Sequence, residues 1–546
     1  MPDASVSEIG SRDGSDADPD HAFLLDDAAL EPGEAVVHFE HGLARFDGLE
    51  ELEVDGAKQT LVRLSFRDDD HLLVPERELD IIWRYGAPAE EVRLDALRTE
   101  HWMDARNALI EELKEVAHEL ADEYERRRGR DAPHIAPPAK KMDAFAADFP
   151  HELTGDQERA VAKVLADMSG PPPMDRILVG DVGFGKTEVA LRAAAAVAFA
   201  GRQVVVAAPT TVLARQHFDT FRERMEPHGI KVRELTGDAD DADETVAALH
   251  SGACDVVVGT HALVSHDLRF DDLGLVVVDE EQRFGADVKR ALRALNGQAG
   301  VHMLLMTATP IPSTMAAAQV GLCEVSVMMD APKDRLPVET KLVEGGGRKA
   351  MLDAIEKELA RGGQAYVVSP RISGIEDDGG VAEMLEGLDA RVEVAHGQQD
   401  AEETAAAMRR FMGGEADVLL ATTLIEAGLD NPRANTMVVW NCDRFGLSQL
   451  HQLRGRIGRA KEQAYMTLLA PDEMSDTARK RLDTFVATSE LGAGFAVARR
   501  DAEMRGHGDV AGEEQSGRTS RLGLGLTRHV LVETLRERLD RPRQAA

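Results

Sequence analysis

The sequence predicts an α/β protein with two tandem parallel-sheet domains, preceded by a small β-barrel and followed by a helical tail. Two repeated patterns and one change of pattern predict this arrangement. Buried-strand runs alternate with helical segments up to about Pro337, and the same alternation restarts near Val338. Before them, short β-like runs are broken by glycines and by an Asp-Gly pair. The expected boundaries are 1–31, 32–92, 93–140, 141–337, 338–475 and 476–546.

The composition limits the class of protein. A chain of 546 residues has room for about three to five domains. No apolar run reaches the roughly 20 residues of a membrane span, and the acidic start is unlike a signal sequence, so we expect no membrane contact. The cysteines Cys254, Cys323 and Cys442 lie far apart without a C-x-x-C pair. This spacing suggests neither a disulfide framework nor a zinc site, and it fits a reducing cytoplasm.

The formal net charge of -35 argues against a nucleic-acid partner, because binding to duplex DNA usually relies on lysine and arginine. Part of this charge lies in residues 1–31, an acidic leader that we expect to be disordered. Backbone N–H groups and Ser/Thr hydroxyls also bind phosphates. Any DNA binding is therefore expected to be weak and sensitive to salt.

The segment 32–92 is predicted to be a β-barrel. Its β-like runs include 35–39, 61–66 and 71–75, and Asp55-Gly56 is typical of a tight hairpin turn. Nothing in this segment carries catalytic chemistry.

The segment 93–140 predicts a long helix and a linker. Apolar residues recur at helical spacing between about 100 and 130, so one face of the helix should pack against the rest of the protein. Pro133 and Pro137-Pro138 are expected to end the helix.

The most specific motif is Gly180-Asp181-Val182-Gly183-Phe184-Gly185-Lys186-Thr187, which fits the phosphate-binding loop G-x-x-x-x-G-K-[ST]. Gly183 and Gly185 let backbone N–H groups close around a phosphate. Lys186 neutralises phosphate charge and the Thr187 hydroxyl holds Mg²⁺. The alternative is a chance glycine turn, but a predicted strand and an alanine-rich helix flank the motif. We therefore expect ATP and Mg²⁺ as cofactors.

Acidic residues follow the apolar strand at 275–278. Asp279 is expected to orient Mg²⁺ through water, and Glu280 to position and deprotonate an attacking water. By itself, such a pair of acids is equally consistent with a solvated turn. Its position about ninety residues after the phosphate loop favours the catalytic interpretation.

Arg456 and Arg459 are three residues apart and are expected on one helical face, in the domain that lacks a phosphate loop. Such arginines stabilise charge on a γ-phosphate from across a domain boundary. An exposed helix with salt bridges is the alternative. If the catalytic interpretation holds, ATP closes the two domains and hydrolysis releases them.

Phe149 and Gln157 precede the phosphate loop by about thirty residues, as expected for a segment that reads adenine; a plain start of a helix is the alternative. Hydroxyl-bearing residues follow several predicted strands, where they are expected to bind the phosphates of one DNA strand. Helix capping is the alternative role for this second group. Its members are Thr210, Thr211, Thr260, His261, Thr422 and Thr423.

Together these segments resemble superfamily 2 helicases, whose motor domains are RecA-like. The segments 180–190, 307–312 and 445–456 are similar to those of the bacterial transcription-repair coupling factors, and RecG helicases share the same motor. The resemblance covers about 32–524 and implies a motor that moves along double-stranded DNA. The resemblance also implies that Glu188 belongs to the ATP site. The catalytic residues it implies are Lys186, Glu280, Gln282, Arg456 and Arg459.

The barrel and the tail also resemble the coupling factors. Residues 36–46 are similar to their Tudor-like RNA polymerase interaction domain, which implies binding of the polymerase β subunit, with Leu52 as a contact or simply as a core residue. Residues 501–517 resemble the translocation motif, with a capped surface loop as the alternative. The coupling residues implied by the resemblance are Arg481, Arg505 and Gln515.

The sequence also departs from the family. Gln282 stands where the coupling factors usually have His, and Ser313 where they usually have Arg. No segment resembles the module related to the excision-repair B protein or the autoinhibitory domain, so recruitment of repair proteins is not implied. The expected function is an ATP-dependent double-stranded DNA translocase that binds RNA polymerase and moves stalled enzyme. The alternatives are a RecG-like fork remodeller and a polymerase-binding adaptor with a vestigial motor.

Overall fold

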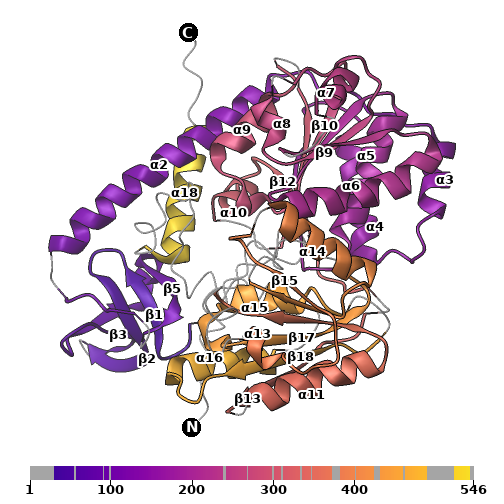
Figure 1. The fold of residues 1–546 in the computed structure, drawn as a ribbon. Helices are drawn as coiled ribbons and strands as arrows, with labels where there is room; N and C mark the ends of the chain where they lie inside the picture. Colours follow the sequence, from indigo (N-terminus) through magenta and orange to yellow (C-terminus); the bar gives the residue numbers. More distant parts are fainter. Residues whose placement is uncertain are drawn as a thin grey trace.

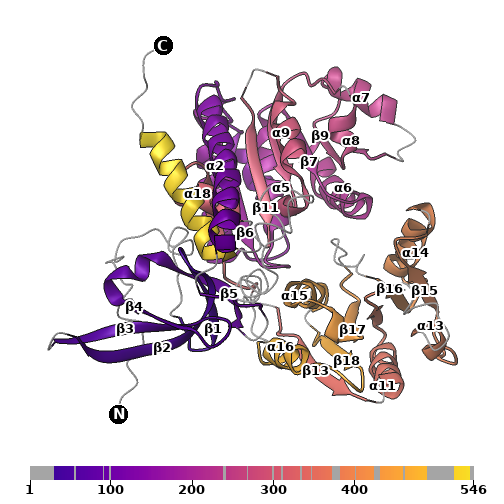
Figure 2. The same ribbon diagram turned by 90° about the vertical axis from the view of Figure 1, so that its left-hand side faces the viewer.

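The protein consists of a small antiparallel sheet and two α/β lobes, shown by the computed structural model in Figure 1 and, turned by 90°, in Figure 2. No helix among the described residues is long and apolar enough to cross a membrane. The structure describes residues 30–54, 57–89, 92–97, 100–237, 242–266, 268–297, 300–308, 312–332, 335–345, 347–371, 381–399, 401–422, 431–458, 462–488 and 522–540.

The N-terminal sheet is antiparallel, in the order β4-β3-β2-β1-β5. One of its faces has a core of its own, which includes Val36, Phe46, Val62 and Leu64. Val54 pairs with Ala57, so β2 and β3 are adjacent antiparallel strands, whereas the predicted Asp55-Gly56 turn lies outside the described residues. The strands are β1 (Glu34–His38), β2 (Gly42–Val54), β3 (Ala57–Ser65), β4 (His71–Pro75) and β5 (Ile82–Pro88), with a short helix η2 (Glu76–Ile81).

The long helix α2 (Glu100–Arg128) runs from this sheet to the first lobe (Figure 1). Its apolar face buries Leu109 and Leu113, as the helical spacing predicts. The helix ends at Arg128, before the prolines that were expected to end it. At its N-terminal end, the Trp102 ring N–H donates to the Phe39 carbonyl (2.9 Å), which fixes the helix to the sheet.

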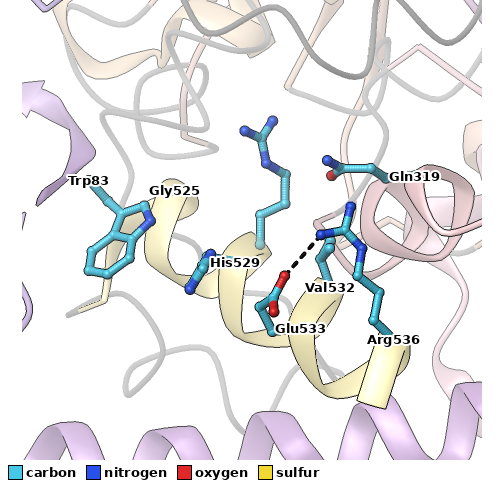
Figure 3. Close-up of a pocket in the computed structure, with 8 residues that line it drawn as sticks. Trp83, Gln319, Gly525, His529, Val532, Glu533 and Arg536 are labelled. Atoms are coloured by element: carbon cyan, nitrogen blue, oxygen red, sulfur yellow. Dashed lines mark hydrogen bonds and ion pairs between the residues drawn. The ribbon is translucent and has the colours of Figure 1, made fainter. Parts of the chain in front are cut away.

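The C-terminal helix α18 (Gly523–Asp540) returns to the start of the chain and packs on α2, α10 and β5. Its buried side chains extend one apolar core from the N-terminal sheet into the first lobe. A polar cavity of about 220 Å³ lies where α18 meets β5 and α10, lined by Trp83, Gln319, His529 and Arg536 among others (Figure 3). This junction joins the two ends of the sequence.

The first lobe has a seven-stranded parallel sheet, in the order β12-β6-β11-β10-β7-β9-β8. Its strands are apolar because helices cover both faces, which gives two separate cores. The strands are β6 (Asp175–Gly180), β7 (Gln203–Ala207), β8 (Val232–Leu235), β9 (Val256–Gly259), β10 (Leu273–Val278), β11 (His302–Thr307) and β12 (Glu324–Met328).

The helices of the first lobe divide between these two cores. One core contains side chains of α3 (Ala139–Ala147), α4 (Gly155–Asp167), α5 (Lys186–Phe199) and α6 (Thr211–Met225). The other contains side chains of α7 (Ala242–His250), α8 (Ala262–Ser265), α9 (Ala286–Ala294) and α10 (Pro312–Gln319), together with α2 and α18. Two 3₁₀ turns complete the lobe, η4 (Glu226–His228) and η5 (Glu281–Arg283).

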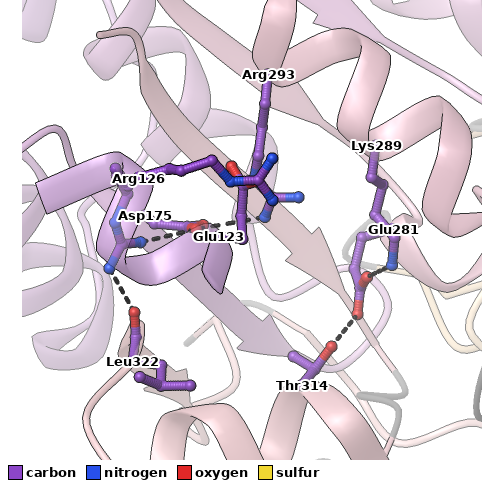
Figure 4. A network of polar contacts seen from close by, with 9 residues as sticks. Glu123, Arg126, Asp175, Glu281, Lys289, Arg293, Thr314 and Leu322 are labelled. Carbon is purple, nitrogen blue, oxygen red and sulfur yellow. Dashed lines mark hydrogen bonds and ion pairs between the residues drawn. The ribbon is translucent and has the colours of Figure 1, made fainter. Parts of the chain in front are cut away.

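A buried polar network fixes α2 to the first lobe (Figure 4). The Asp175 carboxylate on β6 pairs with Arg127 of α2 (2.7 Å) and with Arg293 of α9 (3.3 Å). Nearby, the fully buried Glu281 pairs with Lys289 (2.8 Å). Burying a charge is costly unless a partner compensates it, so these pairs fix the relative positions of their elements.

The second lobe repeats the design, with a parallel sheet in the order β13-β18-β17-β14-β16-β15. Its strands are β13 (Glu339–Glu344), β14 (Gln364–Val368), β15 (Val392–Ala395), β16 (Val418–Ala421), β17 (Ala434–Trp440) and β18 (Tyr465–Ala470). Its helices are α11 (Gly347–Ala360), α13 (Val381–Met384), α14 (Ala401–Gly413), η7 (Cys442–Arg444), α15 (Leu447–Arg454) and α16 (Asp476–Ala487). The predicted fold class, two tandem α/β lobes with parallel sheets, is confirmed.

Candidate nucleotide-binding site

The phosphate-binding loop connects β6 to α5, as the strand-loop-helix pattern predicts. Gly183 and Gly185 have φ values of +80° and +82°, in the left-handed region that glycine adopts without strain. A Cβ atom on Gly185 would collide with the Gln157 amide. Lys186, at the start of α5, donates from Nζ to the carbonyls of Gly180 (2.6 Å) and Asp181 (3.2 Å). The loop is therefore curled around the lysine ammonium group.

Charges from both lobes converge on Lys186. Burial lowers the pKa of Lys186, although the carboxylates of Glu280, Asp279 and Asp181 act to raise it. The positive charge of Arg456, from the second lobe, lowers it further. This convergence brings the predicted lysine, acids and arginine into one site, on the boundary between the lobes.

The acidic residues lie at the carboxyl end of β10. Asp279 accepts a hydrogen bond from the Glu280 backbone N–H (2.9 Å), and Glu280 has a φ of +51°, which is rare for a residue with a side chain. The Gln282 amide donates to the Glu280 carboxylate, and the Thr307 hydroxyl donates to the Gln282 amide oxygen (2.8 Å). Gln282 therefore links the predicted catalytic base to the end of β11.

His217 is a site residue that the sequence did not reveal. Its Nε2 lies 2.7 Å from Asp279 Oδ2, and both side chains are buried. Burial acts to raise the pKa of Asp279, but the hydrogen bond from His217 and the charge of Lys186 hold it below its usual range. Asp279 is therefore ionised at neutral pH. His217 lies on α6, 62 positions earlier, so local spacing gave no signal of this contact.

The second lobe contributes α15 to the site. His451 Nε2 lies 2.8 Å from Asp181 Oδ1 in the phosphate loop, a direct contact between the lobes. Burial acts to raise the pKa of Asp181, but the hydrogen bond from His451 and the charge of Lys186 hold it below its usual range. Arg454 contacts the other ring nitrogen of His451 at 3.2 Å. Its guanidinium lies 4.4 Å from the centre of the Phe485 ring on α16.

Arg456 lies beyond the end of α15, in a turn, and not on a helical face as expected. The helix ends at Arg454, and the following Gly455 packs against the phosphate loop, where a Cβ atom would lie 2.6 Å from Val182 Cβ. Arg456 itself is buried. Arg459, the second predicted arginine, lies outside the described residues.

The predicted adenine-reading residues lie beside the phosphate loop. The Gln157 amide nitrogen donates to the Phe184 carbonyl (2.8 Å), and the amide oxygen accepts from the backbone N–H of Thr154 (2.9 Å), so this side chain also caps α4. Phe149 is half-buried, and its ring lies 6.0 Å from the Arg192 guanidinium.

Two residues at the start of α5 were predicted to belong to the ATP site. Thr187 is half-buried in the first turn of the helix. Glu188 is buried and pairs with Arg192 (2.8 Å) and Arg224 (3.5 Å). Those arginines lie near the Phe149 ring, so the structure places Glu188 toward the segment that precedes α4.

The predicted DNA-contacting residues that the structure describes follow strands of both sheets. Thr210 and Thr260 follow β7 and β9, which are neighbours in the first sheet, so they lie at one edge of it. Thr210 also caps α6 by accepting from the Leu213 N–H (3.3 Å), which is the alternative role. Thr211 and His261 are exposed. Thr422 follows β16 in the second lobe and is buried.

The remaining predicted site residues are spread along the chain. Thr423, Arg505 and Gln515 lie outside the described residues. Arg481, on α16, donates to the Asp443 carbonyl (2.5 Å) in the turn that leads to α15. Leu52 is partly exposed on β2.

Three family models match the chain, in the order expected from its fold. The CarD-like/TRCF RID domain matches residues 30–86, the DEAD/DEAH box helicase model 154–318, and the helicase conserved C-terminal domain 348–461. These matches coincide with the N-terminal sheet, the first lobe and the second lobe.

Relatives with known names match most of the chain. The transcription-repair-coupling factor of Bacillus subtilis is 38% identical over 514 residues, and that of Escherichia coli 40% over 511. These alignments cover 93% and 92% of this chain but 43% and 44% of the relatives, so the chain spans less than half of their length. A structure of RecG bound to a three-way DNA junction matches 86% of the chain and 75% of RecG, with 28% identity and a TM-score of 0.62. The chain therefore carries a CarD-like/TRCF RID domain and both helicase domains, and it is similar to transcription-repair-coupling factors over most of its own length.

Proposed function

We propose that the chain is an ATP-dependent double-stranded DNA translocase that binds RNA polymerase and remodels or displaces stalled transcription complexes. One observation carries the proposal: Lys186, Asp279 and Glu280 of the first lobe share a boundary with His451 and Arg456 of the second. A nucleotide bound there contacts both lobes. Its hydrolysis then changes how tightly the lobes associate.

The site fits a nucleotide with Mg²⁺. The left-handed glycines and the Lys186 ammonium group are suited to a triphosphate, and Asp279 lies close enough to Lys186 for their charges to interact. Thr187 and Asp279 are the residues that would hold the metal, Asp279 through water. The ion, when bound, neutralises phosphate charge.

Glu280 is proposed to accept the proton of the attacking water. Its carboxylate is oriented by the Gln282 amide, which is itself held by Thr307. Arg456, and with it Arg459, is proposed to stabilise charge on the γ-phosphate. Lys186→Ala and Glu280→Gln should each abolish DNA-stimulated ATP hydrolysis. Full hydrolysis in either variant would refute the proposal.

Contacts to DNA are proposed for the hydroxyl-bearing strand ends of both lobes, Thr210, Thr211, Thr260, His261, Thr422 and Thr423. Movement is proposed to be transmitted through Arg481, Arg505 and Gln515. Arg481 already links α16 to the turn before α15. Arg505→Ala should leave ATP hydrolysis intact and stop displacement of a triplex-forming strand. Equal loss of both activities would argue against a coupling role.

The RID domain is proposed to bind the RNA polymerase β subunit, with Leu52 as a contact. Leu52→Glu should weaken capture of β in a pull-down. Leu49→Glu is the matched control. Leu49 is an exposed leucine on the same strand, three positions from Leu52, so the two side chains lie on opposite faces of the sheet. Equal capture by wild type and Leu52→Glu would remove Leu52 from the interface.

The RecG-like alternative is favoured by one observation, the similarity of the fold to RecG. A fork remodeller should hydrolyse ATP faster on forked DNA than on linear duplex of equal length. A polymerase-bound translocase should show no such preference. The match of residues 30–86 to a RID domain supports the translocase.

A further inference from the structure

The linker between the two lobes is held by hydrogen bonds at both ends. At its start, the buried carboxylate of Asp156 accepts the backbone N–H groups of Met329 and Asp330, each at 2.7 Å. At its end, the Gln463 amide donates to the Pro337 carbonyl (2.7 Å). Asp156 belongs to the first lobe and Gln463 to the second. Each end of the linker is therefore held by one of the lobes.

Arg335 lies within this linker and contacts both lobes through its guanidinium. Nη1 donates to the carbonyl of Val182 in the phosphate loop, and Nη2 donates to the carbonyl of Gly455 at 3.4 Å. A Cβ atom on Gly183 would collide with the same guanidinium. The side chain thus lies against the phosphate loop on one side and against the residue before Arg456 on the other.

We propose that Arg335 is a positioning residue that holds the phosphate loop and the Gly455-Arg456 turn in register, so that closure of the lobes brings Arg456 to the nucleotide. The inference deepens the proposed ATPase function and rests on it. An arginine suits this role because its planar group presents several N–H donors in a fixed fork, whereas a lysine presents a single flexible point charge.

The position of Arg335 also links nucleotide binding to closure. Its positive charge lies beside the loop that is proposed to bind phosphate, and its second contact exists only while the Gly455 carbonyl is near. Phosphate binding and lobe closure therefore favour the same placement of the side chain. Two events that favour one conformation promote each other.

The test uses the full chain, with Arg335→Ala and Arg335→Lys, in a steady-state ATPase assay with duplex DNA. We expect kcat to fall about 10- to 100-fold in Arg335→Ala, because small errors in placement of a catalytic group cost that much. The Kd of a non-hydrolysable ATP analogue should stay within about 3-fold of wild type. Arg335→Lys should recover little of the lost kcat, because the charge returns without the fork.

Arg348→Ala is the matched control. Arg348 also donates to two backbone carbonyls, those of Met384 and Glu386, but it lies on α11 away from the phosphate loop. Its removal should leave kcat unchanged. In Arg335→Ala, fluorophores on the two lobes should report a longer distance with bound analogue than in wild type.

Three results would overturn the proposal. The first is a kcat within about 2-fold of wild type in Arg335→Ala, and the second is full rescue by lysine. The third is a double variant Arg335→Ala/Arg456→Ala whose loss equals the product of the single losses, because residues acting through one another are not independent. Retained hydrolysis in Lys186→Ala would instead refute the proposed function, whatever Arg335 does.

Discussion

His451 of the second lobe contacts Asp181 of the phosphate loop, with 2.8 Å between Nε2 and Oδ1. Arg454 contacts the other ring nitrogen, and because arginine only donates, Nδ1 accepts and Nε2 carries the proton given to Asp181. Arg454 in turn lies over the Phe485 ring. A continuous set of contacts therefore runs from the phosphate loop to α16.

We expect His451→Ala to lower the kcat of ATP hydrolysis about 10-fold, since the contact aligns the two halves of the site. Asp181→Asn should act similarly, because it removes the negative charge of the hydrogen-bond acceptor. The double variant should lose little more than either single variant. Steady-state kinetics of the three proteins checks this, and losses that multiply would show that the two residues act separately.

Gln282→Ala should lower kcat with little change in nucleotide affinity. The amide bridges Glu280 and Thr307, so its loss frees the proposed base without touching the phosphate loop. The expected decrease is about 10- to 100-fold. Hydrolysis and analogue binding are measured on the same preparation, and weakened binding with unchanged kcat would contradict the assignment.

Gly185→Ala should abolish nucleotide binding, whereas Gly201→Ala should not. Both glycines have a φ of +82°, so alanine costs about 1–2 kcal/mol of strain at either position. A Cβ at Gly185 also displaces the Gln157 amide, while a Cβ at Gly201 has no heavy atom within 4 Å. Fluorescent-nucleotide titration measures binding by both variants, and thermal melting measures their stability. Together they separate the effect of backbone strain from that of the collision with Gln157. Equal loss of binding would attribute the effect to backbone strain.

Leu531→Ala should destabilise the junction between the N-terminal sheet and the first lobe. Leu531 is fully buried on α18, so a cost of about 2–5 kcal/mol is expected. Arg536→Ala is the control on the same helix, because its exposed pair with Glu533 contributes little. Denaturant unfolding gives both values. A stable Leu531→Ala protein would mean that α18 contributes little to holding the junction.

The N-terminal sheet should lose stability between about pH 6.5 and pH 4. Burial lowers the pKa of His38 to about 4, and the charge of His41 lowers it further. Between these pH values His38 is therefore protonated in the unfolded chain but neutral in the folded protein. Stability should therefore rise with pH across this window, by about 1–2 kcal/mol after allowance for solvent screening. His38→Gln should flatten this part of the profile in urea unfolding. Identical slopes would exclude His38 as the cause.

Local patterns supplied the site predictions where neighbouring residues act together. The phosphate loop and the acids after β10 are short motifs, and the alternation of strands and helices predicted both lobes. Contacts between distant segments gave no such signal. His217 reaches Asp279 from 62 positions away, and Arg335 reaches Gly455 from 120.

Features that depend on the position of an element in the fold were harder to predict from local sequence. The strands β8, β12 and β13 lie at the edges of their sheets. Of these, β8 and β13 are only partly buried, so their sequences lack long apolar runs. The helix before Arg456 ends at Arg454, and Gly455 packs closely against Val182 of the other lobe. Local propensity carries no information on such tertiary demands.

The return of α18 to α2 and β5 has a mechanical consequence for the second lobe. The chain enters that lobe through the Arg335 linker and leaves it through α16, and α18 then anchors it again on the first lobe and the N-terminal sheet. A lobe tethered at both ends loses far less entropy on reassociation than one held by a single tether, because its effective local concentration stays high. In the proposed function, each opening of the lobes is therefore followed by return of the second lobe to the same surface of the first.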